Sequence, residues 1–294
     1  MFGKLSELAT IHCHGKDSKD FLQGQLTCNL KLLKNEVNKN SKLAAHCSPK
    51  GRMISLFRLI YQNEQNYYLI LPKSMVEITL SNLSKYAVFS EVILEDVTKN
   101  ILLIGYDNND QNSKEKDSHC PELKVDYKIV TTELNSNMQL SLYQNINLNT
   151  GIQIAFKDIS EYWHLLNIQN GIPAIYPETS DKFIPQRLNL QELGGLSFKK
   201  GCYIGQEVLS RLYYRGVVKY KMVLGEAELS PPFTPGEKIV DQDKKSIGHL
   251  VDSIIYNNNT YLLFEINILA DKNYLFILHS KIKLLTLPYE DKKT

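Results

Sequence analysis

The sequence lacks most of the signatures that assign a chain to a class at first sight. No apolar run reaches the roughly 18 residues of a membrane-spanning helix, and residues 1–9 lack the basic and apolar regions of a signal peptide. No CxxC pair occurs, so neither a zinc ribbon nor a thioredoxin-like site is predicted. Neither GxGxxG nor GxxxxGK(S/T) occurs, which leaves dinucleotide and P-loop nucleotide binding without support.

Strong charge is also missing. The formal net charge is +2 at pH 7, so any affinity for anions must come from local clusters of basic side chains. The five cysteines are an odd number without regular spacing, which favours a reducing compartment. We therefore expect a cytoplasmic protein with no membrane contact. A chain of 294 residues, with 43% hydrophobic residues, is long enough for two or three cores.

Hydrophobic patterning divides the chain near residue 210. Before it, strands are expected at 8–14, 52–61, 67–71, 88–94 and 101–106, with 52–61 and 67–71 forming a hairpin, and helices are expected after Asp17 through Leu26, at 74–86 and at 162–169. The polar stretch 107–121 is expected to form a surface loop or a degenerate helix. After residue 210, short β-rich runs alternate with turns, which indicates a small antiparallel barrel or sandwich over 210–294, separate from the mixed region over 1–209. The expected C-terminal strands are 209–214, 221–228, 238–240, 246–255, 261–268, 274–278 and 282–286.

The most informative segment places Cys202 between Gly201 and Gly205, after Lys199 and Lys200. Glycine permits positive φ and close approach of a ligand or a second backbone, so the cysteine can be exposed on such a turn. Positive charge nearby would favour its thiolate, which could serve as a nucleophile, a redox thiol or a transient metal ligand. The alternative is a small, buried apolar residue, as most unpaired cysteines are.

A basic and aromatic run extends from Phe198 to Met222. Bases can stack on such rings while cations meet phosphates, so the run could bind RNA or the glutamyl tail of a folate. The alternative is a solvated strand face whose tyrosines pack on a neighbour. The run contains Lys199, Lys200, Arg211, Arg215, Lys219 and Lys221, interleaved with Tyr203, Tyr213, Tyr214 and Tyr220.

Two further features have competing interpretations. On a strand, His12 and His14 share one face while Cys13 takes the other, so the three cannot converge on one ion and no metal site is predicted. Trp163, the only tryptophan, could pack in a core or stack on a flat bicyclic ligand.

Taken together, several separated stretches resemble the YgfZ family, folate-binding relatives of the glycine-cleavage aminomethyltransferase T-protein. The Lys-Gly-Cys-Tyr-x-Gly-Gln-Glu element at 200–207 is highly specific to that family. The matching stretches run from about residue 8 to the C-terminus and include 15–27, 44–53, 85–89, 163–173, 183–190, 194–207 and 287–289.

The resemblance implies a GcvT-like α+β folate-binding body with a ferredoxin-like lobe, followed by a C-terminal antiparallel β-barrel. It implies that the pterin lies in a central opening, that Cys202 is the functional thiol and that Trp163 contacts folate. It also implies tetrahydrofolate-dependent support of iron–sulfur enzymes, with an effect on methylthio modification of tRNA. Some family members carry a second tryptophan on the first strand, where this chain has Leu8, which offers no π face.

We therefore expect an accessory protein that binds tetrahydrofolate or another reduced folate and supports the assembly or repair of iron–sulfur client enzymes, affecting tRNA indirectly. Two alternatives stay open: a folate-dependent aminomethyl transferase, and a protein that contacts tRNA directly. Whether the chain is an enzyme at all is left open. Residues expected to support the Cys202 motif are Lys200, Gly201, Tyr203, Gly205, Gln206, Glu207 and Arg211.

Overall fold

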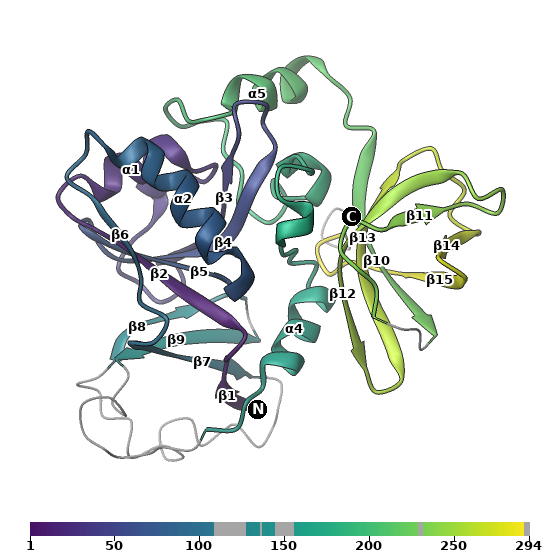
Figure 1. Ribbon diagram of the computed structural model, residues 1–294, viewed down its shortest axis with the longest axis horizontal. Coiled ribbons are helices and arrows are strands. Elements are labelled where there is room, and N and C mark those ends of the chain that lie inside the picture. The colour runs from purple at the N-terminus through teal and green to yellow at the C-terminus, as the bar shows by residue number, and fades with distance from the viewer. Residues whose placement is uncertain (109–127, 136, 145–155, 229–231, 291–294) are drawn as a thin grey trace. The chain divides into compact units, whose positions relative to one another are not determined.

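The computed structural model describes residues 1–108, 128–135, 137–144, 156–228 and 232–290 (Figure 1). Most of the polar stretch 107–121, including Cys120, lies outside these residues. The chain forms two compact units, each built from three segments. The first contains Met1–Gln23, Asn29–Lys42 and Phe57–Trp163, and the second contains Gly24–Cys28, Leu43–Leu56 and His164–Thr294.

A four-stranded sheet of the first unit has the order β1-β7-β9-β8, and its neighbouring strands are antiparallel. The alternation of buried and exposed side chains is weak in β7, because most of its residues are at least partly covered. The strands are β1 (Phe2–Lys4), β7 (Ile101–Asp107), β9 (Met138–Gln144) and β8 (Lys128–Glu133).

The five-stranded sheet has the order β3-β4-β5-β2-β6, with β6 at an edge. The predicted hairpin is confirmed as β4 and β5, which pair antiparallel around the turn at 64–65. The predicted first strand is confirmed as β2. The strands are β3 (Ser41–Cys47), β4 (Met53–Asn63), β5 (Asn66–Pro72), β2 (Leu8–His14) and β6 (Ile93–Asp96).

Three predicted helices are confirmed, as α1 (Ser18–Gln25), α2 (Val76–Ala87) and α4 (Ser160–Gln169). The predicted strand at 88–94 is largely wrong, because regular pairing with β2 begins only at Ile93. Val88 and Phe89 instead follow the end of α2 and are exposed, so their apolar character reflects no buried strand.

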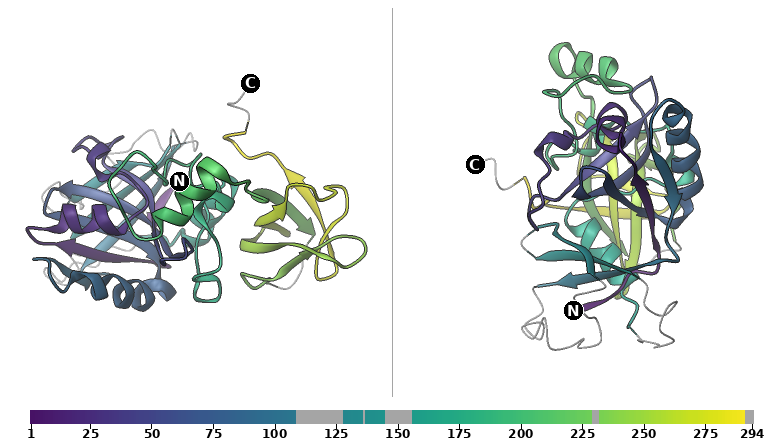
Figure 2. Two further views of the ribbon diagram at one scale, coloured as in Figure 1. Left: turned by 90° about the horizontal axis from the view of Figure 1, so that it is seen from above. Right: turned by 90° about the vertical axis from the view of Figure 1, so that its left-hand side faces the viewer.

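The C-terminal strands close into a six-stranded antiparallel barrel, as expected (Figure 2). Its order is β10-β13-β12-β11-β14-β15, and inward-pointing side chains fill the interior, as alternation along each strand requires. The strands are β10 (Tyr220–Glu228), β11 (Lys238–Val240), β12 (Ser246–Tyr256), β13 (Asn259–Asn267), β14 (Leu275–Ile277) and β15 (Ser280–Leu285).

The predicted strand at 209–214 is wrong, because this stretch lies within helix α5 (Gln206–Arg215). Only Leu209 is buried along the helix, while Val208, Tyr213 and Tyr214 are exposed. These β-branched and aromatic residues are typical of strands, but here they lie on the open surface of a helix. The preceding irregular stretch contains only short 3-10 turns, at Pro177–Thr179 and Pro185–Leu188.

No helix in the described part of the chain is long and apolar enough to cross a membrane.

Candidate functional site

Cys202 is exposed, whereas Cys13, Cys28 and Cys47 are buried. Burial raises the pKa of the Cys13 thiol to about 12, and burial likewise raises that of Cys47. These two thiols are thereby kept protonated and away from solvent. Cys202 is the accessible thiol of the described residues, so its alternative interpretation as a small core residue is wrong.

Lys200 holds the loop that carries Cys202. Its Nζ donates hydrogen bonds to the carbonyl oxygens of Leu26, at 2.7 Å, and Cys28, at 2.6 Å. Nζ also lies 5.0 Å from the centre of the Tyr203 ring. Burial lowers the pKa of Lys200 to about 8. Lys200 therefore anchors the loop through the backbone of residues 26–28.

The same short segment, Gly24–Cys28, makes three more contacts with this part of the chain. The Thr27 hydroxyl donates to the Gly195 carbonyl at 2.6 Å, and the Ser197 N–H donates to the Thr27 carbonyl at 2.9 Å. The Ile204 N–H donates to the Gly24 carbonyl at 3.3 Å. Residues 24–28 thus hold the stretch 195–204 at both ends.

Gly205 is required where the loop enters α5. Its φ is +81°, in the left-handed region, and a Cβ there would lie 2.6 Å from the Ser48 carbonyl oxygen. Gly51, also at positive φ, closes the same turn against Leu209. The close approach of residues 48–51 and 205–209 therefore depends on both glycines.

Gly201 differs from Gly205. Its φ is not positive, and no described atom lies within 4 Å of where its Cβ would be. Neither the backbone nor packing requires glycine at this position, and the space beside the residue before Cys202 is open. Tyr203 is buried, and its N–H donates to the Gln206 Oε1 at 3.3 Å.

Helix α5 presents rings and cations to solvent. The Phe198 and Tyr213 rings stack with centroids 4.1 Å apart, and Tyr214 meets Tyr213 edge-on at 4.8 Å. Tyr213 and Tyr214 stay 47% and 67% exposed, respectively. Tyr213 thus packs on Phe198 while both tyrosines stay largely open to solvent, and the strand face of the alternative is replaced by a helix. Other exposed residues of this surface are Lys199, Glu207, Arg211, Arg215 and Lys219.

The sequence is similar along most of its length to curated bacterial proteins. It is 36% identical over 267 residues to the tRNA-modifying protein YgfZ of Photobacterium profundum, covering 86% of this chain and 78% of that protein. It is 30% identical over 306 residues to the protein of that name in Aliivibrio fischeri strain MJ11, covering 97% and 91%. The chain belongs to the YgfZ family. No protein-family model matches it.

The fold of this YgfZ-family chain is that of the T-protein. The crystal structure of glycine cleavage system aminomethyltransferase T from Bartonella henselae superimposes with a TM-score of 0.68 at 11% identity, covering 98% of this chain and 85% of that one. The expected fold class, an α+β body with a C-terminal antiparallel barrel, is confirmed.

Trp163 lies in the first unit of this YgfZ-family chain and is 3% exposed. A Cβ on Gly105 would come within 2.7 Å of the indole atom Cε3, so the ring rests directly on the β7 backbone. The expected contact of Trp163 with folate stays a prediction. The described residues leave little of the ring open to a ligand.

A buried carboxylate that sequence reasoning missed is Asp252, 2% exposed, on β12. Its Oδ1 lies 2.9 Å from His164 Nε2 and accepts from the Tyr176 hydroxyl at 3.0 Å. Burial lowers the pKa of His164, but the charge of Asp252 and its hydrogen bond outweigh burial, and the net shift is upward. The pairing register shifts between Leu250 and Asp252, so a β-bulge places this side chain.

Glu265 on β13 is a second buried carboxylate that the sequence did not indicate. Its Oε1 lies 3.3 Å from His249 Nδ1 and 3.5 Å from an Arg187 nitrogen. The Arg187 guanidinium also lies 4.6 Å from the centre of the Tyr220 ring. His249 is directly opposite Glu265 in the register of β12 and β13, a pairing that is visible only once the strands are placed.

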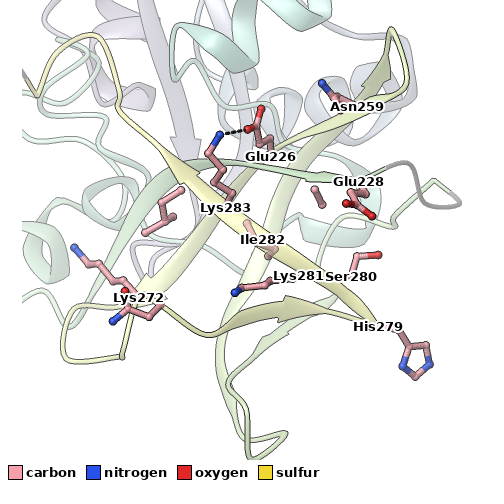
Figure 3. A pocket seen from close by; sticks show the side chains of 12 residues that line it. Glu226, Glu228, Asn259, Lys272, His279, Ser280, Lys281, Ile282 and Lys283 are labelled. Carbon is pink, nitrogen blue, oxygen red and sulfur yellow. Dashed lines mark hydrogen bonds and ion pairs between the residues drawn. The ribbon is translucent and has the colours of Figure 1, made fainter.

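A pocket of about 860 Å³ opens on the barrel (Figure 3). Its lining is mostly polar and charged, and Lys283 donates to Glu226 at 2.7 Å across it. Ligand pockets for flat heterocycles are mostly apolar. None of the site residues expected from the sequence lines this pocket, so it is separate from the Cys202 loop.

Proposed function

We propose that this chain is an accessory protein that binds a reduced folate and supports the assembly or repair of iron–sulfur enzymes in the cytoplasm, and so affects tRNA modification indirectly. The observation that carries the proposal is the exposed thiol of Cys202 on a loop held by residues distant in sequence. The relatives named as tRNA-modifying proteins support the link to tRNA.

The residues around the Cys202 loop suit the glutamyl tail of a folate better than its pterin ring. Exposed Lys199, Arg211 and Arg215 offer the cations that glutamyl carboxylates prefer. Trp163, which belongs to the first unit, is only 3% exposed and leaves little of its ring open to a flat heterocycle. A reduced folate would supply one-carbon chemistry when bound. The chain's own residues would bind its tail and keep the Cys202 thiol accessible to a client protein.

A cellular experiment tests the thiol. Cells that lack the protein should regain activity of their iron–sulfur enzymes when given the wild-type chain, but not when given Cys202→Ala. Cys47→Ala, which removes a buried thiol of the same unit, serves as the control for loss of a cysteine. Full rescue by Cys202→Ala at equal protein levels would reject the role of Cys202.

A titration tests the ligand. Tetrahydrofolate should change the fluorescence of Trp163, the single tryptophan, at micromolar concentrations. Arg211→Ala combined with Arg215→Ala should weaken binding by about tenfold or more if the tail meets these cations. No change in fluorescence up to high micromolar folate would reject the contact of folate with Trp163, and no heat of binding in a calorimetric titration over the same range would reject the ligand. Transfer of an aminomethyl group to free tetrahydrofolate by the purified chain would favour the transferase alternative.

A second candidate function, direct binding of tRNA, is favoured by the exposed rings and cations on α5. Single-stranded bases stack on exposed aromatic side chains, and arginines meet the phosphates. A plot of the logarithm of tRNA affinity against the logarithm of salt concentration has a slope that reports the number of phosphate contacts. Each lost contact should reduce this slope by about one. Arg215→Ala should do so, whereas Lys238→Ala, exposed on the barrel, should not. tRNA affinity that is equal for both variants would reject this surface.

A further inference from the structure

Two histidines and a glutamate meet at the edge of the five-stranded sheet, within the first unit. His12 and His14 are two residues apart on β2, so they share one face, and Cys13 is buried on the other. The register of β2 and β6 pairs His12 with Glu95 and His14 with Ile93. Glu95 is therefore directly opposite His12 and diagonal to His14, on an exposed edge strand.

The ligand atoms of these three residues are close to the spacing that a metal ion requires. Glu95 Oε1 lies 3.1 Å from His14 Nε2 and 3.7 Å from His12 Nδ1. One ligand atom from each residue lies within 4.8 Å of the other two. A tetrahedral ion with bonds of about 2.0–2.1 Å separates its ligand atoms by about 3.4 Å. Two of the three separations thus differ from this value by only a few tenths of an ångström.

A neighbouring amide orients His12. The Asn66 Oδ1 lies 3.0 Å from His12 Nε2, and the Asn66 amide nitrogen donates to Asn63 Oδ1 at 3.0 Å. Because its nitrogen is used in this way, Asn66 presents its oxygen as an acceptor. The proton of neutral His12 then resides on Nε2, which leaves the lone pair on Nδ1, the nitrogen 3.7 Å from Glu95 Oε1. Metal-binding histidines commonly have such a partner on the second nitrogen.

The stacking of the histidine rings shows which side chain must rotate when a metal ion binds. His12 stacks on Tyr68, with centroids 4.6 Å apart and planes 9° apart, and on His14, at 4.5 Å and 23°. A nitrogen lone pair lies in the ring plane, so two nearly parallel rings do not point at one ion. His14 must therefore turn about its terminal torsion, a soft rotation that also adjusts the distance of its Nε2 from Glu95.

Exposure and charge both suit a cation. The side chains of His12, His14 and Glu95 are 17%, 30% and 51% exposed, so water can reach the open positions of a bound ion. Neutral imidazole is the form that coordinates metals, and Glu95 supplies the negative charge.

We propose that His12, His14 and Glu95 bind a divalent transition-metal ion, such as Zn²⁺, through three protein ligands that leave the remaining positions to water. Two imidazoles and one carboxylate are a donor set that suits such ions. The sequence pattern alone suggested no site, because Cys13 faces away. Glu95 supplies the third ligand from 81 residues further along the chain.

The test is a titration of the full chain with Co²⁺ and Zn²⁺ after treatment with a chelator. The Cys202→Ser background removes the exposed thiol as a competing ligand. We expect one equivalent of Co²⁺ to bind with micromolar affinity, to give the visible absorption of a four-coordinate ion, and to be displaced by Zn²⁺. His14→Ala and Glu95→Gln should each weaken binding by about tenfold or more. His279→Ala, an exposed histidine of the barrel, should not.

Wild-type affinity in His14→Ala, or no binding at millimolar Co²⁺, would reject the site and leave a simple histidine–glutamate ion pair. A second measurement does not depend on the folding of any variant. In the parent chain, one equivalent of Zn²⁺ should shift the imidazole ¹⁵N resonances of His12 and His14 and leave that of His279 unchanged. Shifts confined to other histidines would overturn the proposal.

Discussion

Around Cys202, the group that can react is exposed and the groups that hold it are partly or fully buried, whereas around Asp252 the charged group itself is buried. Lys200 secures the first region through two backbone carbonyls. His164 and Tyr176 secure the second through the carboxylate of Asp252. Both regions belong to the second unit.

This difference in burial separates the residue that determines reactivity, Cys202, from the residue that determines stability, Asp252. A change at Cys202 removes a solvent-exposed atom and should alter chemistry without altering the fold. A change at Asp252 removes the shared partner of two side chains and should alter the free energy of unfolding without altering the thiol. A substitution at Cys202 should therefore change thiol reactivity but not stability, and a substitution at Asp252 should change stability but not thiol reactivity.

The largest effect is expected for Asp252→Ala. The carboxylate is the shared hydrogen-bond acceptor of His164 and Tyr176, so its loss leaves both without a partner, and we expect the free energy of unfolding to fall by roughly 3 kcal/mol. Denaturation in urea measures this loss, and the rate at which Cys202 reacts with a thiol reagent should stay unchanged. Asp243→Ala, at an exposed carboxylate of the same barrel, should cost less than about 0.5 kcal/mol. Equal stability of the two variants would contradict the structural role of Asp252.

Gly205→Ala should change both stability and thiol reactivity, because Gly205 lies in the loop that carries Cys202 and its backbone conformation is also needed for folding. A methyl group at φ +81°, 2.6 Å from the Ser48 carbonyl oxygen, should cost about 2 kcal/mol or more and change the rate of thiol modification. Gly201→Ala has open space and should cost less than about 0.5 kcal/mol. The pair is informative because the two glycines flank the same cysteine. Similar costs for both would show that packing at Gly205 is not limiting.

Sequence reasoning succeeded where local pattern decides the structure. The barrel strands alternate and are bounded by turn residues, so β10 to β15 were predicted nearly at their observed bounds. It failed at α5, where Val208, Tyr213 and Tyr214 have the composition of a strand but lie on a helix. Tertiary context decides the structure of such a stretch, since the residue that precedes α5, Gly205, packs closely against Ser48, which is 157 positions earlier in the chain.

Parts of the candidate site could not be predicted because their partners are distant in sequence. Lys200 was expected to favour the thiolate of Cys202, but its hydrogen bonds go to carbonyls 174 and 172 residues earlier. Asp252 depends on a β-bulge, and Glu95 depends on the register of an edge strand. Neither a bulge nor a register follows from the local pattern of a single sequence.

Lys200→Met should weaken the support of the loop while sparing the thiol itself. Loss of the donor to the Leu26 and Cys28 carbonyls should cost about 1–3 kcal/mol at neutral pH, measured by urea denaturation. Lys219→Met, at an exposed lysine, is the matched control.

The cost of Lys200→Met should also depend on pH. Burial lowers the pKa of Lys200 from 10.5 to about 8, so the unfolded chain binds more protons than the folded chain between these values. The wild type should therefore gain stability relative to Lys200→Met as the pH rises from about 8 towards 10.5. A difference that shrinks over this range would contradict the burial of the ammonium group.

The smallest effect is expected for His164→Gln, which keeps a hydrogen-bonding group beside Asp252 but removes the charge. The pKa of His164 is raised in the folded chain, so its ion pair stabilises the fold fully below the unfolded value of 6.5 and is lost as the pH rises through the folded value. The variant should be about 1 kcal/mol less stable than the wild type at acidic pH and nearly equal to it at alkaline pH. Urea denaturation at several pH values measures the difference. Because Cys202 is exposed and does not depend on this pair, its reactivity should follow the same pH profile in both chains, and a changed profile would mean that the two regions are coupled.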